Sequence, residues 1–208
     1  RDARGIDTAK WAALAYEHLS PQKEIEVKPN RTIEHIAEAF GARGPSCNCM
    51  TACAASTQSV GEAYHMLKRG DADVMIAGGS HTMIHVLGMT GFIRLTAMST
   101  RRDDAKHASR PFDSGRDGFV MGEGAGILIL ERLDHAKARG ATPLAEIAGY
   151  GSSADAYRIT DIQPNGQGGV VAMRQACEHA GIDPTKPDAK GRPPVQYISA
   201  HGTGTQEN

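Results

Sequence analysis

The pattern of apolar and polar positions predicts helices that alternate with short apolar strands. The most regular helical stretch follows Cys53 and ends at Gly70, with apolar positions spaced i, i+3, i+4 and i+7 at Val60, Ala63, Tyr64 and Leu67. The apolar run at residues 74–77 is closed by two glycines, which is typical of a fully buried strand. A helix followed by a buried strand is half of a βαβ unit. We therefore predict an α/β fold with a parallel or mixed central sheet.

The same periodicities predict the remaining elements. Further helices are expected at residues 7–19, 30–41, 133–139 and 166–181, each with a cap or a stop signal. Further strands are expected at residues 47–51, 127–130, 144–150 and 195–199. Residues 22–28 are expected to form a loop or an edge strand, and residues 88–98 a short helix and turn.

Length and charge exclude several classes of protein. The chain has 208 residues, enough for a good core, and its 23 basic and 24 acidic side chains nearly cancel. This balance is not typical of nucleic-acid or membrane-surface binding, so we expect neither partner. The apolar runs are too short to span a bilayer, and the first residues do not resemble a secretory signal. With four cysteines we expect no disulfide framework and a cytoplasmic location.

Cys53 is the first candidate for chemistry. It lies among small residues, at or just before the start of the helix that ends at Gly70. Unpaired N–H groups and the positive end of the helix dipole favour a thiolate there, and the small neighbours let a substrate carbonyl approach the sulfur. The alternative interpretation is a buried structural cysteine. Cys47, Cys49 and Cys53 have no fourth ligand at a usual zinc spacing, so we predict no metal site.

Two further stretches concentrate polar side chains. His201 follows the strand expected at residues 195–199, and ligands of α/β sheets gather at the carboxyl ends of strands. The glycines and threonines at residues 202–205 favour close approach of a ligand and offer hydroxyls to bind it. Residues 110–124 interleave arginine and aspartate with glycine and phenylalanine, which predicts a rigid ion-paired scaffold. Each stretch by itself also fits a purely structural role.

Together these motifs resemble those of the β-ketoacyl synthases. The matching stretches are the nucleophile motif Thr51-Ala52-Cys53-Ala54-Ala55-Ser56, the central signature from Arg110-Pro111-Phe112-Asp113 through Gly122-Glu123-Gly124, and the first histidine motif Ala200-His201-Gly202-Thr203-Gly204-Thr205. Residues 151–156 look most like the synthase II branch. The resemblance implies a thiolase-like, layered α/β/α/β/α sandwich that is partial in this chain. Residues 1–208 would form one β-ketoacyl synthase domain, whose N-terminal half passes into the C-terminal half near residues 145–165.

The resemblance implies decarboxylative Claisen condensation of a malonyl group with a cysteine-bound acyl chain in fatty acid biosynthesis. Cys53 would take the acyl group from an acyl carrier protein, and its backbone N–H would help hold the oxyanion. His201 would hydrogen-bond the malonyl thioester carbonyl and stabilise the enolate. Thr203 and Thr205 would bind the pantetheine arm, and Phe112 would line the acyl pocket. No metal or soluble cofactor is implied, because the substrates are carried on the phosphopantetheine of acyl carrier protein.

Part of the family's pattern lies outside this sequence. The family's second catalytic histidine, a lysine and a glycine-rich gate would come after residue 208, and Arg158 stands where this branch usually has histidine. We therefore expect a fragment, an internally deleted form or an incomplete chain. The alternatives to the enzyme are a non-catalytic ketosynthase-like partner subunit, which Cys53 argues against, and a thiolase-type coenzyme A enzyme, which residues 110–124 and 201–205 argue against.

The resemblance also implies a homodimer. In the family, the strand that leads to the nucleophile pairs with its counterpart across a two-fold axis. Here that strand would be residues 47–51, which contain no lysine or proline to protect a free edge. The alternative is a strand inside the sheet of a monomer.

Overall fold

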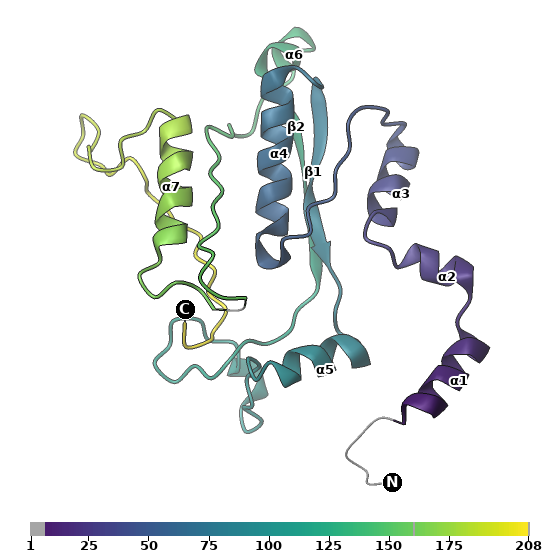
Figure 1. The fold of residues 1–208 in the computed structure, drawn as a ribbon. Coiled ribbons are helices and arrows are strands. Elements are labelled where there is room, and N and C mark those ends of the chain that lie inside the picture. The colour runs from purple at the N-terminus through teal and green to yellow at the C-terminus, as the bar shows by residue number, and fades with distance from the viewer. Residues whose placement is uncertain (1–6, 160, 208) are drawn as a thin grey trace. The chain divides into compact units, whose positions relative to one another are not determined.

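The computed structural model describes residues 7–159 and 161–207, which divide into two compact units between Met50 and Thr51 (Figure 1). The N-terminal unit contains helices α1 (Thr8–His18), α2 (Pro21–Glu26) and α3 (Arg31–Phe40). Helices α1 and α3 confirm the helices predicted at residues 7–19 and 30–41.

Helix α2 corrects the expectation of a loop or an edge strand at residues 22–28. The Ser20 hydroxyl accepts a hydrogen bond from the Lys23 N–H at 3.2 Å, and Pro21 occupies the first helical turn. A capping hydroxyl and a proline with its φ already restricted to helical values favour a helix start. These local signals outweigh the weak apolar pattern of the segment.

The second unit is organised around one helix and a strand pair. Helix α4 (Ala55–Arg69) packs along strand β1 (Val74–His81), which pairs with strand β2 (Gly124–Glu131) (Figure 1). Ala63, Leu67 and Ala77 are buried at the contact between α4 and β1, at 3%, 9% and 3% exposure. The helix and both strands therefore confirm the elements that apolar periodicity predicted.

The direction of the strands corrects the sequence-based expectation. Strands β1 and β2 run antiparallel, with Val74 opposite Glu131 and His81 opposite Gly124, so the described sheet is neither parallel nor mixed. The chain between them passes through helix α5 (Val86–Arg94), which supports the short helix predicted at residues 88–98. Because the connection, and not the strands themselves, sets their relative direction, apolar runs alone could not decide it.

Full burial was also expected for the strand at residues 74–77, and it is wrong for three of these four residues. Val74 is 43% exposed, and Ile127, Leu128 and Ile129 on β2 are 49%, 48% and 62% exposed. Helix α4 covers mainly β1, so many apolar side chains of β2 remain accessible within the described chain. An apolar run identifies a strand, but the packing partners determine how much of it is buried.

The strands predicted at residues 47–51, 144–150 and 195–199 are absent from the described chain, where these segments belong to no sheet. A strand exists only when a second segment supplies its ladder of hydrogen bonds. Residues near 150 pack against helices instead. The Tyr150 ring lies directly over Gly61 of α4, and Gly151 lies against the Ala172 carbonyl of helix α7 (Gln167–His179).

Helices α6 (Leu133–Ala138) and α7 agree with the helices predicted from periodicity at residues 133–139 and 166–181. Short 3₁₀ turns occur at Ala52–Ala54 and Ala105–His107.

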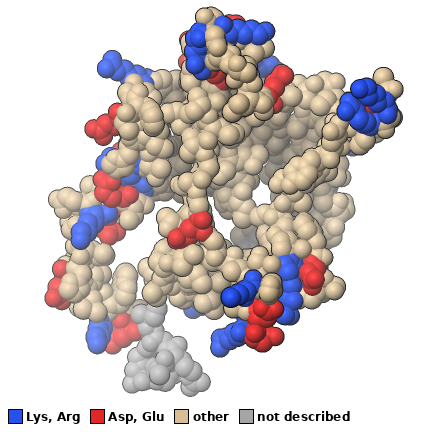
Figure 2. Space-filling view, turned by 180° about the vertical axis from the view of Figure 1, so that it is seen from behind, with Lys and Arg blue, Asp and Glu red and all other residues tan. Residues whose placement is uncertain are grey.

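Glu131, at the end of β2, accepts hydrogen bonds from Arg139 and His135, and these bonds lower its pKa to about 2. Lys and Arg side chains lie next to Asp and Glu side chains on the face drawn in Figure 2. No helix in the described residues is long and apolar enough to cross a membrane.

Gly78 is a position in β1 at which the backbone of β2 leaves no room for a side chain. Its φ is +153°, and a Cβ there would lie 2.1 Å from the Gly126 carbonyl oxygen on β2. We expect Gly78→Ala to lower the free energy of unfolding by about 1–3 kcal/mol, because the strand backbones would have to separate. Urea denaturation measures the difference.

Gly126→Ala is the matched control, because a Cβ on Gly126 would meet nothing within 4 Å. This variant should unfold close to the wild-type urea midpoint. Equal midpoints for the two variants would contradict the close approach of β1 and β2 at Gly78.

Candidate active site

Cys53 lies in the 3₁₀ turn Ala52–Ala54, directly before α4, and is exposed. Its placement at the start of a helix is as predicted, whereas the alternative of a buried structural cysteine is wrong for the described chain. The Ala54 N–H donates to the Thr51 carbonyl at 3.1 Å, which closes the turn around the thiol. Cys53 therefore stands next to the positive end of the α4 dipole.

Ala52 has a φ of +50°, a left-handed conformation that is unusual for alanine. It turns the chain sharply just before the thiol. A non-glycine residue held in this region costs about 1 kcal/mol or more and must be stabilised by its surroundings. Alanine has no preference for the left-handed region, so the sequence does not predict this conformation of Ala52.

The first turns of α4 are fixed to β1. The Gly78 N–H donates to the Ser59 hydroxyl at 3.2 Å, and a Cβ on Gly79 would lie only 2.0 Å from the Ser56 hydroxyl oxygen. Gly78 and Gly79 were expected to close the strand, but they lie inside β1 and let the helix approach it closely. This contact holds the helix start, and with it Cys53, against the sheet.

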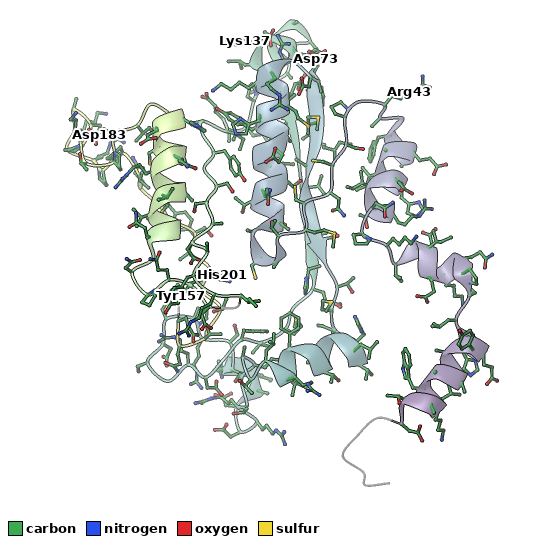
Figure 3. The ribbon with its side chains drawn as sticks, viewed as in Figure 1. Arg43, Asp73, Lys137, Tyr157, Asp183 and His201 are labelled. Carbon is green, nitrogen blue, oxygen red and sulfur yellow. The ribbon has the colours of Figure 1, made fainter. Side chains whose placement is uncertain are left out.

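His201 is exposed and opens the histidine loop, which we define as residues 201–206 (Figure 3). Gly202 and Gly204 have φ values of +58° and +81°. Thr203 and Thr205 are half-buried, and their hydroxyl oxygens lie 2.8 Å apart in a hydrogen bond. The Thr205 N–H also donates to the Thr203 hydroxyl at 3.3 Å. The two threonines predicted to bind substrate thus form one hydroxyl pair.

Phe112 lies against this loop. A Cβ built on Gly202 would be 3.4 Å from the Phe112 ring, so the phenyl edge is in contact with the residue next to His201. Phe112 itself has a φ of +65° and is 64% exposed. Four of the five predicted site residues, Phe112, His201, Thr203 and Thr205, are therefore brought together.

Residues 110–119, which we call the signature block, hold the histidine loop. The Gly118 N–H donates to the Gly204 carbonyl at 3.0 Å, and Arg116 Nε donates to the Thr205 carbonyl at 2.8 Å. This corrects the expectation of an ion-paired scaffold, because no ion pair joins the arginines and aspartates of the block within the described residues. The guanidinium group of Arg116 instead donates hydrogen bonds to main-chain carbonyls.

Two carboxylates fix the surroundings of the block. Asp117 accepts hydrogen bonds from the Ser99 hydroxyl at 2.7 Å and the Thr100 N–H at 3.0 Å, and these bonds lower its pKa. Glu123 accepts from the Ile84 N–H at 2.9 Å and the Thr82 hydroxyl at 2.8 Å, which lowers its pKa in the same way. Both groups therefore act as ionised acceptors that anchor loops.

Cys53 and His201 belong to the same unit, and no hydrogen bond joins them in the described part of the chain.

A hollow of about 600 Å³ lies at the start of α7, lined in part by Ser153, Asp155 and Arg158 and by none of the predicted site residues. Residues 7–159 and 161–207 contain no group of three His, Cys, Asp or Glu side chains placed to hold a metal ion.

Solved structures define the class of fold. A chain of the AntDE:AntF complex, a type II PKS acyl-carrier protein with its ketosynthase, superposes with a TM-score of 0.84 at 36% identity, covering 92% of this chain and 45% of that one. A β-ketoacyl synthase from Burkholderia phymatum superposes with a TM-score of 0.82 at 31% identity, covering 98% and 48%. The chain therefore has part of the thiolase-like α/β fold of the ketosynthases, as the motifs implied.

Matches to models of protein families identify the family within this class of fold. The N-terminal domain of β-ketoacyl synthases matches residues 14–136, and the C-terminal domain of the same enzymes matches residues 144–208. The chain belongs to the β-ketoacyl synthase family.

Two curated relatives agree with this assignment. The 3-oxoacyl-[acyl-carrier-protein] synthase 2 of Staphylococcus aureus is 49% identical over 177 residues, 85% of this chain and 42% of that protein. The mitochondrial 3-oxoacyl-[acyl-carrier-protein] synthase of Arabidopsis thaliana is 43% identical over 188 residues, 90% of this chain and 39% of that protein. The chain thus spans less than half the length of these relatives.

Proposed function

We propose that this protein is a 3-oxoacyl-acyl-carrier-protein synthase of fatty acid biosynthesis, which joins a malonyl group to a cysteine-bound acyl chain with loss of carbon dioxide. The observation that supports this most directly is Cys53, an exposed thiol in a strained turn at the start of a 15-residue helix. Membership of the β-ketoacyl synthase family and the names of the curated relatives support the same reaction.

The first step in this proposal is acyl transfer. The Cys53 thiolate attacks the thioester carbonyl of an acyl group on an acyl carrier protein, and the pantetheine thiolate leaves. The backbone N–H of Cys53 stabilises the oxyanion that forms in between. A thioester suits the resting product, because it keeps the acyl carbonyl reactive for the next step.

The second step uses the histidine loop. His201 donates a hydrogen bond to the malonyl thioester carbonyl, and the enolate that forms as carbon dioxide leaves is stabilised by that bond. The enolate carbon attacks the acyl carbonyl on Cys53, and the Cys53 thiolate is the leaving group. The 3-oxoacyl product is then attached to the carrier protein. Thr203 and Thr205 bind the pantetheine arm, and Phe112 lines the acyl pocket. No metal or soluble cofactor is needed in this scheme, because decarboxylation itself supplies the carbanion.

The test separates the two steps. The protein is incubated with acyl-charged carrier protein and then with malonyl-charged carrier, and intact mass and product chromatography follow each stage. We expect an acyl adduct on Cys53 and then a 3-oxoacyl carrier product. Absence of the adduct from Cys53, with wild-type folding intact, would overturn the proposed function.

The proposed partner is an acyl carrier protein. One of the structural relatives is a ketosynthase solved with its acyl-carrier protein, which supports the same type of partner here. The proposed location is the cytoplasm, since a catalytic thiol at Cys53 works only in its reduced form.

The proposed assembly is a homodimer. Residues 47–51 form no strand within the described chain, and Met50 is 69% exposed, so an apolar side chain of the segment is accessible to a second copy. Sedimentation of the protein at micromolar concentration should give a dimer, and Asn48→Pro should shift it toward monomer. A wild-type monomer with full condensing activity would contradict the assembly.

A further inference from the structure

The Arg116 side chain is committed entirely to main-chain carbonyls. Its Nε donates to the Thr205 carbonyl at 2.8 Å, and its Nη2 donates to the Gln206 carbonyl at 3.1 Å. Its Nη1 donates to the Asp113 carbonyl of its own turn at 3.0 Å. The third bond orients the planar guanidinium group, so that the other two nitrogens point at the end of the histidine loop.

The loop returns hydrogen bonds to the signature block. Gln206 Nε2 donates to the Arg116 carbonyl at 2.7 Å, and the Gly204 carbonyl accepts from the Gly118 N–H at 3.0 Å. A Cβ on Gly204 would lie 2.8 Å from the Gly118 carbonyl oxygen, so the two backbones are in close contact. Segments nearly ninety residues apart in the sequence are thus joined on both sides of Arg116.

The histidine loop needs this support because its own conformation is weakly determined. Two of its six residues are glycines with positive φ, and glycine has more conformations available than any other residue. Hydrogen bonds within the loop join Thr203 and Thr205. The bond from Arg116 to the Thr205 carbonyl restrains the peptide plane that follows Thr205, and with it the backbone that carries the two threonines.

We propose that Arg116 is a positioning residue that holds the histidine loop in the conformation that binds the pantetheine arm. The inference rests on the proposed function of Thr203 and Thr205. Arg116 does not contact the substrate. It acts through the carbonyls of Thr205 and Gln206, so a change at Arg116 affects binding of the pantetheine arm only through the position of the loop.

Arg116→Lys tests this directly, because lysine keeps the charge but replaces three directed donors with one ammonium group. We expect the KM for the carrier-protein substrate to rise about tenfold, while kcat for acyl transfer to Cys53 stays within about twofold. A purely structural role would lower the melting temperature and the active fraction, and hence kcat, with an unchanged KM. That pattern would overturn the proposal.

Amide hydrogen exchange on the same proteins gives a readout that does not depend on activity. The Gly118 N–H, which donates to the Gly204 carbonyl, should exchange at least about tenfold faster in Arg116→Lys. Unchanged exchange would overturn the positioning role even if the wild type condenses acyl chains. A wild type with no acyl adduct, together with faster exchange in the variant, would overturn the proposed function and leave the role in holding the loop supported.

Two further variants complete the design. Arg139→Lys is the matched control, since Arg139 also donates through Nε and Nη2, but to Glu131 at the β2–α6 corner. It should change neither KM nor the exchange of Gly118. Gln206→Ala removes the bond that the loop donates to the Arg116 carbonyl and should raise KM in the same direction as Arg116→Lys. If Arg116→Lys fails to fold, an unchanged KM in Gln206→Ala overturns the proposal.

Discussion

Cys53→Ala should accept no acyl group, with a loss of at least about a thousandfold in the rate of acyl transfer. Removing the nucleophile of a covalent mechanism leaves only the background reaction, and such losses are among the largest measured for single substitutions. The substitution should have little effect on stability, because the Cys53 side chain is exposed. Intact mass after incubation with acyl-charged carrier protein measures the adduct.

Cys47→Ala is the matched control, because Cys47 is also exposed but does not stand at a helix start. It should form the adduct at the wild-type rate. Brief treatment with limiting iodoacetamide, followed by peptide mapping, should label Cys53 before Cys47, Cys49 and Cys177. Preferential labelling of Cys177, or an adduct that survives in Cys53→Ala, would mean that another thiol is the nucleophile.

His201→Ala should lower malonyl decarboxylation by two or more decades while Cys53 still accepts an acyl group. The loss corresponds to the removal of one hydrogen-bond donor to a developing oxyanion, about 10²–10³ in rate. His201 lies in the exposed part of the histidine loop, so the substitution should leave the fold intact. Release of carbon dioxide from malonyl carrier and the mass of the acyl adduct report the two steps separately.

Two variants sharpen this test. His201→Asn keeps a neutral N–H donor and should retain more decarboxylation than His201→Ala if donation to the carbonyl is the role of the side chain. His107→Ala is the control, since His107 is another exposed histidine and pairs with Asp104, outside the histidine loop. An equal loss of acyl transfer and decarboxylation in a folded His201→Ala protein would show that His201 is not specific to the malonyl step.

The elements that the sequence predicted well are those whose hydrogen bonds close within a few residues. Helix α4 follows from its i, i+3, i+4 spacing and its glycine stop, and the same spacing placed Cys53 at a helix start. Helix α2 differs from the expectation although its signal is also local, because the capping hydroxyl of Ser20 outweighs a poor apolar pattern. The motifs at Cys53, Phe112 and His201 likewise lie in contiguous stretches, and they indicate the family from the sequence alone.

The strands and the site contacts depend on partners that are remote in the sequence. Residues 144–150 and 195–199 have strand composition, but no segment of the described chain supplies their ladders. The antiparallel pairing of β1 with β2 depends on the connection through α5. The arginines of the signature block were expected to pair with aspartates, yet Arg116 donates hydrogen bonds to the carbonyls of Thr205 and Gln206.

The sequence by itself therefore determined the family, the start of helix α4 and the set of candidate side chains, because these are properties of contiguous residues. Only the tertiary structure decided the left-handed turn at Ala52, the hydroxyl pair of Thr203 and Thr205, and the role of Arg116 in holding their loop. The physical reason is that backbone carbonyls carry no sequence signature. Which donor reaches them is settled only when distant segments pack together.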